Sequence, residues 1–192
     1  MKQPSIFIIL LCFLFLAIVT RGQVNLSLRA PNNLRPAIEK VLSSYSDHYS
    51  QVKGDTLSVT GTSIVYASVV KPTSAENCIL TEYLNTEKYD YSWEAMVLNT
   101  DDFEAAAKKY NTCCQQLKNM TVKTGGETSK MEGEYEPPEG TKNFYSTVFS
   151  ASAESPLLQK LRVEVLMESD LTSWKIRILV YDRVHEDKEG NM

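Results

Sequence analysis

Three cysteines, Cys78, Cys113 and Cys114, are the most reactive side chains that the sequence offers outside its apolar N-terminal run. Thiols tend to pair in an oxidising compartment, but adjacent cysteines on a helix do not reach disulfide geometry easily. We therefore predict one bridge, from Cys78 to Cys113 or Cys114, with one thiol left over. The alternative is three buried apolar thiols, because free cysteine is among the most buried residue types.

The chain holds only two histidines, His48 and His185, so few sites could depend on histidine chemistry. A zinc site built from the cysteines and one histidine would lack the paired ligand spacing that marks such sites. A Cys–His nucleophile pair has no sequence signature either. We expect both histidines to be solvated surface residues.

Carboxylates offer one further pattern. Glu132, Glu134 and Glu136 alternate, so a strand would place three carboxylates on one face, where they could hold a cation. They border a Pro-Pro turn, and we favour a solvated acidic strand end. The sequence also lacks the patterns of hydrolases, zinc proteases, phosphate loops, dinucleotide folds and calcium loops. We predict no catalytic residue, no metal site and no cofactor, and a protein that leans away from an enzyme.

Tyrosine is unusually frequent, with ten residues against six Phe and two Trp. A tyrosine side chain has an apolar body and a polar tip, which suits binding surfaces. Several aromatic residues lie in or near the segment 85–91, and there we predict an aromatic binding face, with core-edge packing as the alternative. Its members are Tyr83, Tyr89, Tyr91 and Trp93.

Two asparagines, Asn25 and Asn119, each begin an Asn-x-Ser/Thr sequon. Such asparagines are acceptors for N-glycosylation in hosts that modify exported proteins. Both positions are compatible with a surface location, and we retain both as possible glycosylation sites.

The N-terminus resembles a targeting segment. Lys2 is the only charged residue before a 14-residue apolar run over 6–19. A helix of that length reaches about 21 Å, short of the roughly 30 Å hydrocarbon core of a bilayer. A basic start, a short apolar run and the small residues Thr20 and Gly22 are typical of a secretory signal peptide. We predict that 1–22 is cleaved and that the protein is secreted or periplasmic; the alternative is an uncleaved anchor.

Cleavage after Gly22 would leave 170 residues with 18 basic and 24 acidic side chains, a net charge of −6. An acidic chain without a basic cluster repels phosphate backbones, so we predict no nucleic-acid partner. The remaining sequence has no second apolar run of the length that a spanning helix needs, which predicts no stable membrane span after cleavage.

These side chains are positioned by a chain that alternates helical and strand patterns. Apolar residues recur at helical spacing over 33–51 and again from 101 to 117, where Asp101 and Glu104 resemble a capping box. Period-two alternation between turn residues predicts strands elsewhere. The predicted strands are 57–69 with a bulge or bend at Gly61, 78–84, 93–98, 120–124, 129–135, 143–152, 161–167 and 174–180.

We predict an α+β class, in which two helices pack on one face of an antiparallel sheet and leave the other face to solvent or to a partner. Residues 23–181 would form this single domain, and 182–192 a charged, disordered tail. The order of elements further predicts a duplicated α-βββ unit, with halves at 31–99 and 100–181. Similar closing strands begin at Ser92-Trp93 and Ser173-Trp174, although coincidence between two half-buried strands is the alternative.

From these features we expect an exported, non-catalytic binding module for a protein, a glycan or a small ligand. Two alternatives stay open. One is a self-associating structural protein in which the leftover thiol joins two chains. The other is an enzyme with a site assembled from distant residues, and Cys113 or Cys114 beside His48 is the first place to look.

Overall fold

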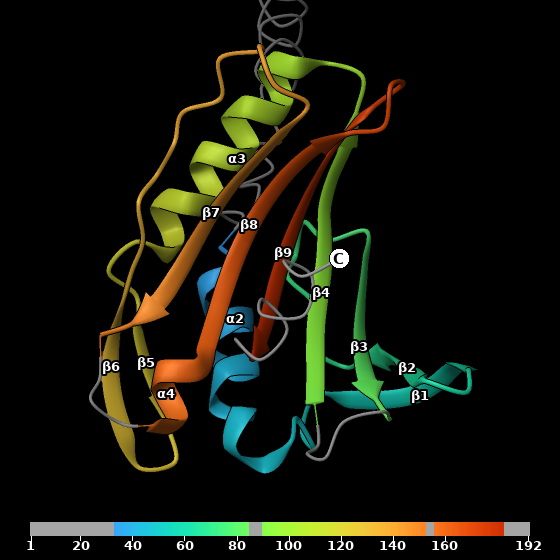
Figure 1. Cartoon of the computed structure of the whole chain (residues 1–192), viewed down its shortest axis with the longest axis vertical. Helices are drawn as coiled ribbons and strands as arrows, with labels where there is room; N and C mark the ends of the chain where they lie inside the picture. The colour runs from blue at the N-terminus through green and yellow to red at the C-terminus, as the bar shows by residue number, and fades with distance from the viewer. Residues whose placement is uncertain (1–32, 85–89, 153–155, 183–192) are drawn as a thin grey trace, which may run out of the picture. The chain divides into compact units, whose positions relative to one another are not determined.

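The computed structural model describes residues 33–84, 90–152 and 156–182 (Figure 1). The described chain is mostly one large nine-stranded antiparallel sheet, with 23% of residues helical and 47% in strands. The predicted α+β class of two helices packed on a sheet is therefore wrong, because the sheet dominates the structure. One reason is local: the change of phase at Gly61 is a hairpin turn between two strands, not a bend in one strand.

The described helices are short. Helix α2 (Arg35–Ser43) starts with a proline in its first turn and is followed by the 3-10 turn η1 (Tyr45–Asp47). Helix α3 (Phe103–Leu117) starts at Asp102, whose carboxylate accepts hydrogen bonds from the backbone N–H groups of Glu104 and Ala105. Helix α4 (Pro156–Lys160) is a single turn before the eighth strand. The helix predicted over 33–51 thus ends well before its predicted boundary.

Nine strands form the sheet in the order β1-β2-β3-β4-β9-β8-β7-β6-β5, and every neighbouring pair is antiparallel. Figure 1 shows this order from β1 at the right to β6 and β5 at the left. Strands β4 and β9 pair in the middle, so strands from the two ends of the chain join there. The strands are β1 (Lys53–Val59), β2 (Ser63–Ser68), β3 (Asn77–Tyr83), β4 (Asp90–Thr100), β5 (Thr121–Thr124), β6 (Glu127–Glu132), β7 (Phe144–Ala151), β8 (Leu161–Ser169) and β9 (Trp174–Asp182).

The predicted α-βββ unit is wrong as well, because four strands follow α2 and five follow α3. The two similar segments lie on the two central strands, β4 and β9. Trp93 is fully buried opposite Val180, whereas Trp174 is half-buried with its ring 5.3 Å from the ring of Phe103. The two tryptophans therefore occupy different environments.

The hydrophobic core lies on the face of the sheet that α3 covers, where α3 packs on β4, β8 and β9. Alternate residues of the central strands point into this core, and helix α2 lies against β5. A hydrogen bond of 2.7 Å from the Leu34 backbone N–H to the Gln116 side chain ties the start of α2 to α3. Buried members from the central strands include Tyr91, Trp93, Ala95, Val97, Val163, Val165, Met167, Ile176, Ile178 and Val180.

The opposite surface of the sheet, which we call the open face, carries charged as well as apolar side chains. Arg177 of β9 lies 3.4 Å from Glu94 of β4 and 2.7 Å from Glu168 of β8. Phe144 and Val148 of β7 point to the same face and are partly exposed. In the described part of the chain, no helix has the length and apolar character to cross a bilayer.

Candidate functional site

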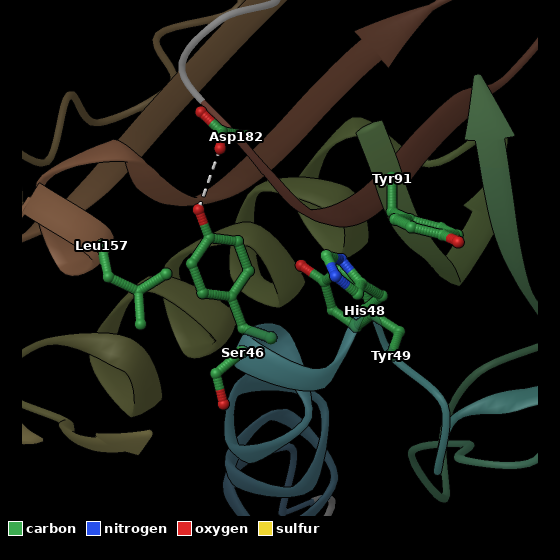
Figure 2. Close-up of a pocket in the computed structure, with 7 residues that line it drawn as sticks. Ser46, His48, Tyr49, Tyr91, Leu157 and Asp182 are labelled. Carbon is green, nitrogen blue, oxygen red and sulfur yellow. Dashed lines mark hydrogen bonds between the residues drawn. The ribbon is translucent and has the colours of Figure 1, made fainter. Parts of the chain in front are cut away.

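A small hollow, which we call the aromatic hollow, opens where η1, the first residues of β4, the end of β9 and α4 come together (Figure 2). Its volume is about 120 Å³. Segments far apart in the sequence build it, because the β4–β9 pairing brings residue 91 close to residue 182. It is lined by Tyr45, Ser46, His48, Tyr49, Tyr91, Leu157 and Asp182.

The backbone at this hollow is strained. His48 and Tyr49 both have positive φ angles, of 58° and 57°. Non-glycine residues adopt this region rarely, at a cost of order 1–3 kcal/mol each when strained, and such residues cluster at functional sites. The tight turn ends η1 and directs both side chains to the hollow, which a continued helix would not do.

Aromatic rings form most of the wall. The ring centroids of Tyr45 and Tyr49 are 6.0 Å apart, and those of Tyr49 and Tyr91 are also 6.0 Å apart. His48 lies 6.1 Å from Tyr91 at a tilted angle. These separations are typical of aromatic contacts, so the rings form one continuous cluster around the hollow.

Two phenol groups give the hollow polar atoms. The Tyr45 hydroxyl donates a hydrogen bond of 3.0 Å to Oδ2 of Asp182. The Tyr49 hydroxyl is buried and has no hydrogen-bond partner among the residues that the structure describes. An unpaired buried hydroxyl costs about 1–3 kcal/mol of stability, so Tyr49 is an unused polar group beside the polar Ser46, His48 and Asp182 of the same wall.

Burial raises the pKa of Tyr45 above its ordinary value, and the negative charges of Asp182 and Asp90 raise it further. The positive charge of Arg162 acts in the opposite direction. Burial raises the pKa of Tyr49 strongly, with further contributions from Tyr45 and the same two aspartates. Both phenols are therefore neutral at physiological pH, in a field in which negative charge prevails.

A second polar group adjoins the hollow behind Tyr91. Lys53 Nζ lies 2.9 Å from Glu82 Oε2, and the Tyr66 hydroxyl donates a hydrogen bond of 2.8 Å to the same oxygen. The lysine ammonium also lies 3.9 Å from the centre of the Tyr66 ring and 5.8 Å from that of Tyr91. Partial burial raises the pKa of Glu82, but hydrogen bonds from Lys53 and Tyr66 outweigh it, so the pKa is lowered.

The structure distributes the predicted aromatic face over several environments. Tyr91 lines the aromatic hollow, and Trp93 is buried with its indole N–H donating to Ser68 Oγ at 2.9 Å. Tyr83 projects from the sheet face opposite to that of its neighbour Glu82, which pairs with Tyr91. Tyr89 lies outside the described residues. The three described residues of the predicted face therefore do not form one surface.

The cysteines are not joined in the structure. Cys78, Cys113 and Cys114 are free and buried, which is the alternative of three buried apolar thiols. Burial raises the pKa of Cys78 and Cys114 to about 11 and that of Cys113 to about 12. None of them lines the hollow that contains His48, so the predicted first place for an enzyme site is not assembled there.

The remaining candidates lie elsewhere. Strand β6 ends at Glu132, so Glu134 and Glu136 are not on a strand, and the described residues contain no cluster that could hold a metal ion. Asn119 is exposed in the turn after α3, where its φ of 59° suits a position just past a helix end, while Asn25 lies outside the described residues. A second hollow, of about 360 Å³, is lined by Glu39, Ser43, Thr121 and Lys123.

The sequence contained only partial signals for the hollow. Tyr45 and Tyr49 have the four-residue spacing of a helix face, so their pattern predicted an amphipathic helix rather than a binding turn. Asp182 was assigned to the charged tail, but it is the last residue of β9. A polar segment of Ser, Asp and His at 46–48 inside a predicted helix was the one local hint of a turn.

No protein-family model matches the chain, and no curated protein or solved structure has significant similarity to it.

Proposed function

We propose that the protein is an exported, non-catalytic binding module and that the aromatic hollow is its ligand site. The observation that carries the proposal is Tyr49, a residue that lines a hollow of aromatic rings and whose buried hydroxyl has no hydrogen-bond partner in the described part of the chain. Small-molecule sites combine an apolar wall with a few polar groups that orient the ligand. Tyr49 supplies such a group, and the strained turn at His48 and Tyr49 supports the same interpretation.

The groups at the hollow do not support a nucleophilic mechanism. Ser46, His48 and Asp182 line it together, and these are the residue types of a serine hydrolase. However, Figure 2 shows Ser46 directed away from His48, and its oxygen is hydrogen-bonded to Thr124 Oγ1 at 3.3 Å. Asp182 accepts a hydrogen bond from Tyr45. The serine therefore lacks the adjacent base that would activate it.

The alternative of a structural protein joined by a leftover thiol has little support. All three cysteines of the described chain are buried, so none offers an exposed thiol to a second copy. A binding module remains the function that fits the hollow best.

Ligand binding can be tested by saturation-transfer NMR with a library of small polar and aromatic compounds. Two variants of equal design give the control: Leu157→Trp fills the hollow, and Val148→Trp adds the same bulk on the open face, where the parent residue has the same 37% exposure. We expect the protein and Val148→Trp to bind the same compounds, and Leu157→Trp to lose them. If no compound binds, or if Leu157→Trp binds as before, the proposal is overturned.

A further inference from the structure

We infer that the ligand of the aromatic hollow is a small organic cation, a protonated amine or a quaternary ammonium group. This inference rests on the proposed function and adds the chemistry of its ligand. Four separate features of the hollow and its surroundings support it: the balance of charge, the arrangement of rings, the use of one ring by Lys53, and the volume.

The charges around the hollow favour a cation. Asp182 lines it directly, and the charge of buried Asp90 acts on Tyr45 and Tyr49 together with that of Asp182. Arg162 acts on Tyr45 in the opposite direction, but the carboxylate that lines the hollow itself is negative. An anionic ligand would be repelled here, and a cation would be attracted.

The rings of the hollow suit the same ligand. Tyr45, Tyr49 and Tyr91 are linked by centroid distances of 6.0 Å and meet at different angles, 73° for the first pair and 59° for the second. A cation within about 6 Å of an aromatic face gains about 0.5–2 kcal/mol, and aromatic cages of this kind recognise quaternary ammonium groups in proteins. Rings that meet at steep angles can surround a rounded ammonium group better than parallel rings can.

The protein itself already uses one of these rings for a cation. Lys53 Nζ lies 5.8 Å from the centre of Tyr91 and 3.9 Å from that of Tyr66, and Glu82 supplies the counter-charge at 2.9 Å. Lys53 does not line the hollow, but Tyr91 belongs to both groups, so one of the hollow's rings already lies near an ammonium group.

The volume limits the size of the bound group. A hollow of about 120 Å³ is smaller than the roughly 300–1,000 Å³ of pockets for drug-sized ligands. It corresponds to about four water molecules at roughly 30 Å³ each. A trimethylammonium group or the end of an alkylamine fills such a space, whereas a sugar ring or a nucleobase is too large to enter completely.

The decisive experiment compares choline with dimethylbutanol, in which a carbon atom replaces the choline nitrogen and removes the charge. Ligand-observed NMR titrations measure both affinities. We expect choline to bind about tenfold more tightly, because cation–π attraction and the carboxylate act only on the charged compound. Equal affinities would overturn the inference but leave the binding site intact. If neither compound binds and the wider library also fails, the proposed function itself fails.

A pair of charge variants locates the effect. Asp182→Asn keeps an oxygen that can accept from Tyr45 but removes the negative charge, and Asp55→Asn removes the same charge from exposed strand β1. We expect choline binding to weaken about tenfold in Asp182→Asn and to change less than twofold in Asp55→Asn. Dimethylbutanol should bind Asp182→Asn unchanged, which also shows that the variant is folded. Equal losses of choline binding in the two variants would overturn the inference.

An ammonium group reaches the hollow either as a free amine or as a lipid headgroup. Sedimentation with phosphatidylcholine vesicles distinguishes these sources of the same chemistry. We expect the protein to bind free choline and to remain in the supernatant with vesicles, since the hollow is small and the exposed Leu157 is the one aliphatic side chain that lines it. Co-sedimentation that choline competes away would assign the group to a headgroup, and failure of both would overturn the inference.

Discussion

The Tyr49 hydroxyl shows how far single residues of the site could be predicted. Ten tyrosines indicated a binding protein, but their number could not show which of them keeps an unpaired hydroxyl. That property depends on the left-handed backbone of His48 and Tyr49, and neither residue type favours such a turn strongly enough to be read from sequence. Tyr91 was among the candidate residues near segment 85–91 and lines the hollow, whereas Asp182 and Tyr45 were not candidates, because their contact spans 137 positions.

The unpaired hydroxyl leads to a stability prediction. Tyr49→Phe should leave the protein as stable or raise its free energy of unfolding by about 1 kcal/mol, since it removes a buried group without a partner. Tyr110→Phe is the matched control, because the Tyr110 hydroxyl is equally buried but lies 2.7 Å from Thr147 Oγ1. The free energy of unfolding of Tyr110→Phe should be lower than that of the unchanged protein by about 1 kcal/mol. Urea denaturation measures both, and a larger loss in Tyr49→Phe than in Tyr110→Phe would contradict the prediction.

Glu82 predicts how stability depends on pH. Its pKa is lowered in the folded protein by Lys53 and Tyr66. A carboxyl group with a lowered folded pKa stabilises the protein above its unfolded pKa, about 4.3, and the stabilisation is lost as the pH falls through the folded value. We expect the free energy of unfolding to fall below about pH 5, and to fall less steeply in Glu82→Gln. Exposed Glu134→Gln removes a carboxylate elsewhere and should leave the slope as in the unchanged protein.

At the scale of elements, strands were predicted more accurately than helix ends. The period-two patterns located most of β3, β4, β7, β8 and β9, because alternate residues of these strands face the core. The helix predicted to reach residue 51 ends at Ser43. The prediction was too long because the apolar spacing continues through residues 45 and 49, although the backbone turns there. The spacing of apolar residues indicates which side chains are buried, and a turn can bury the same residues that a helix would.

The N-terminus of α3 gives an element-scale prediction. Asp102, not the predicted Asp101, accepts the hydrogen bonds from the first turn. Asp102→Ala should therefore lower the free energy of unfolding by about 1 kcal/mol, the usual cost of losing a capping residue. Asp101→Ala, an exposed neighbour of the same type, should change it by less than about 0.5 kcal/mol. Equal effects in thermal denaturation would show that the cap is not at Asp102.

Close packing of the chain after β6 gives a second prediction at the scale of elements. A Cβ atom on Gly133 would lie 2.5 Å from the Val148 carbonyl oxygen and 2.9 Å from a carbon of the Phe149 ring. Gly133→Ala should therefore lower the free energy of unfolding by about 1–3 kcal/mol, because the added atom forces the chain at residue 133 and strand β7 apart. Gly61→Ala, with nothing within 4 Å of the added atom, should be neutral or stabilise by about 0.4–1 kcal/mol. Equal melting temperatures of the two variants would contradict this difference.

At the scale of the whole molecule, the sheet order was beyond the sequence patterns. Local alternation predicts where strands are but contains no information on which distant strands pair. The central contact of β4 with β9 joins residues about eighty positions apart. The predicted fold class failed at this level, because nine strands in one continuous sheet outweigh the helices that pack on it.

The whole fold buries the three thiols, and thiol labelling of the folded and the denatured protein can measure this burial. Cys78, Cys113 and Cys114 are buried, and burial holds their pKa values at about 11, 12 and 11. We expect a thiol reagent at mildly alkaline pH to label none of them in the folded protein and all three in denaturant, at a rate set by unfolding. A single reactive thiol in denaturant without reductant would instead show that two of the three cysteines are joined by a disulfide.

The pairing of β4 with β9 has a consequence for how the chain is made. A polypeptide emerges from the ribosome with its N-terminus first, so β1 to β4 are complete long before the final strand is synthesised. Until residues 174–182 arrive, β4 has one edge of unsatisfied backbone groups, and β8 lacks its neighbour as well. Such edges attract other chains. The sheet can therefore close only after β9 has been synthesised.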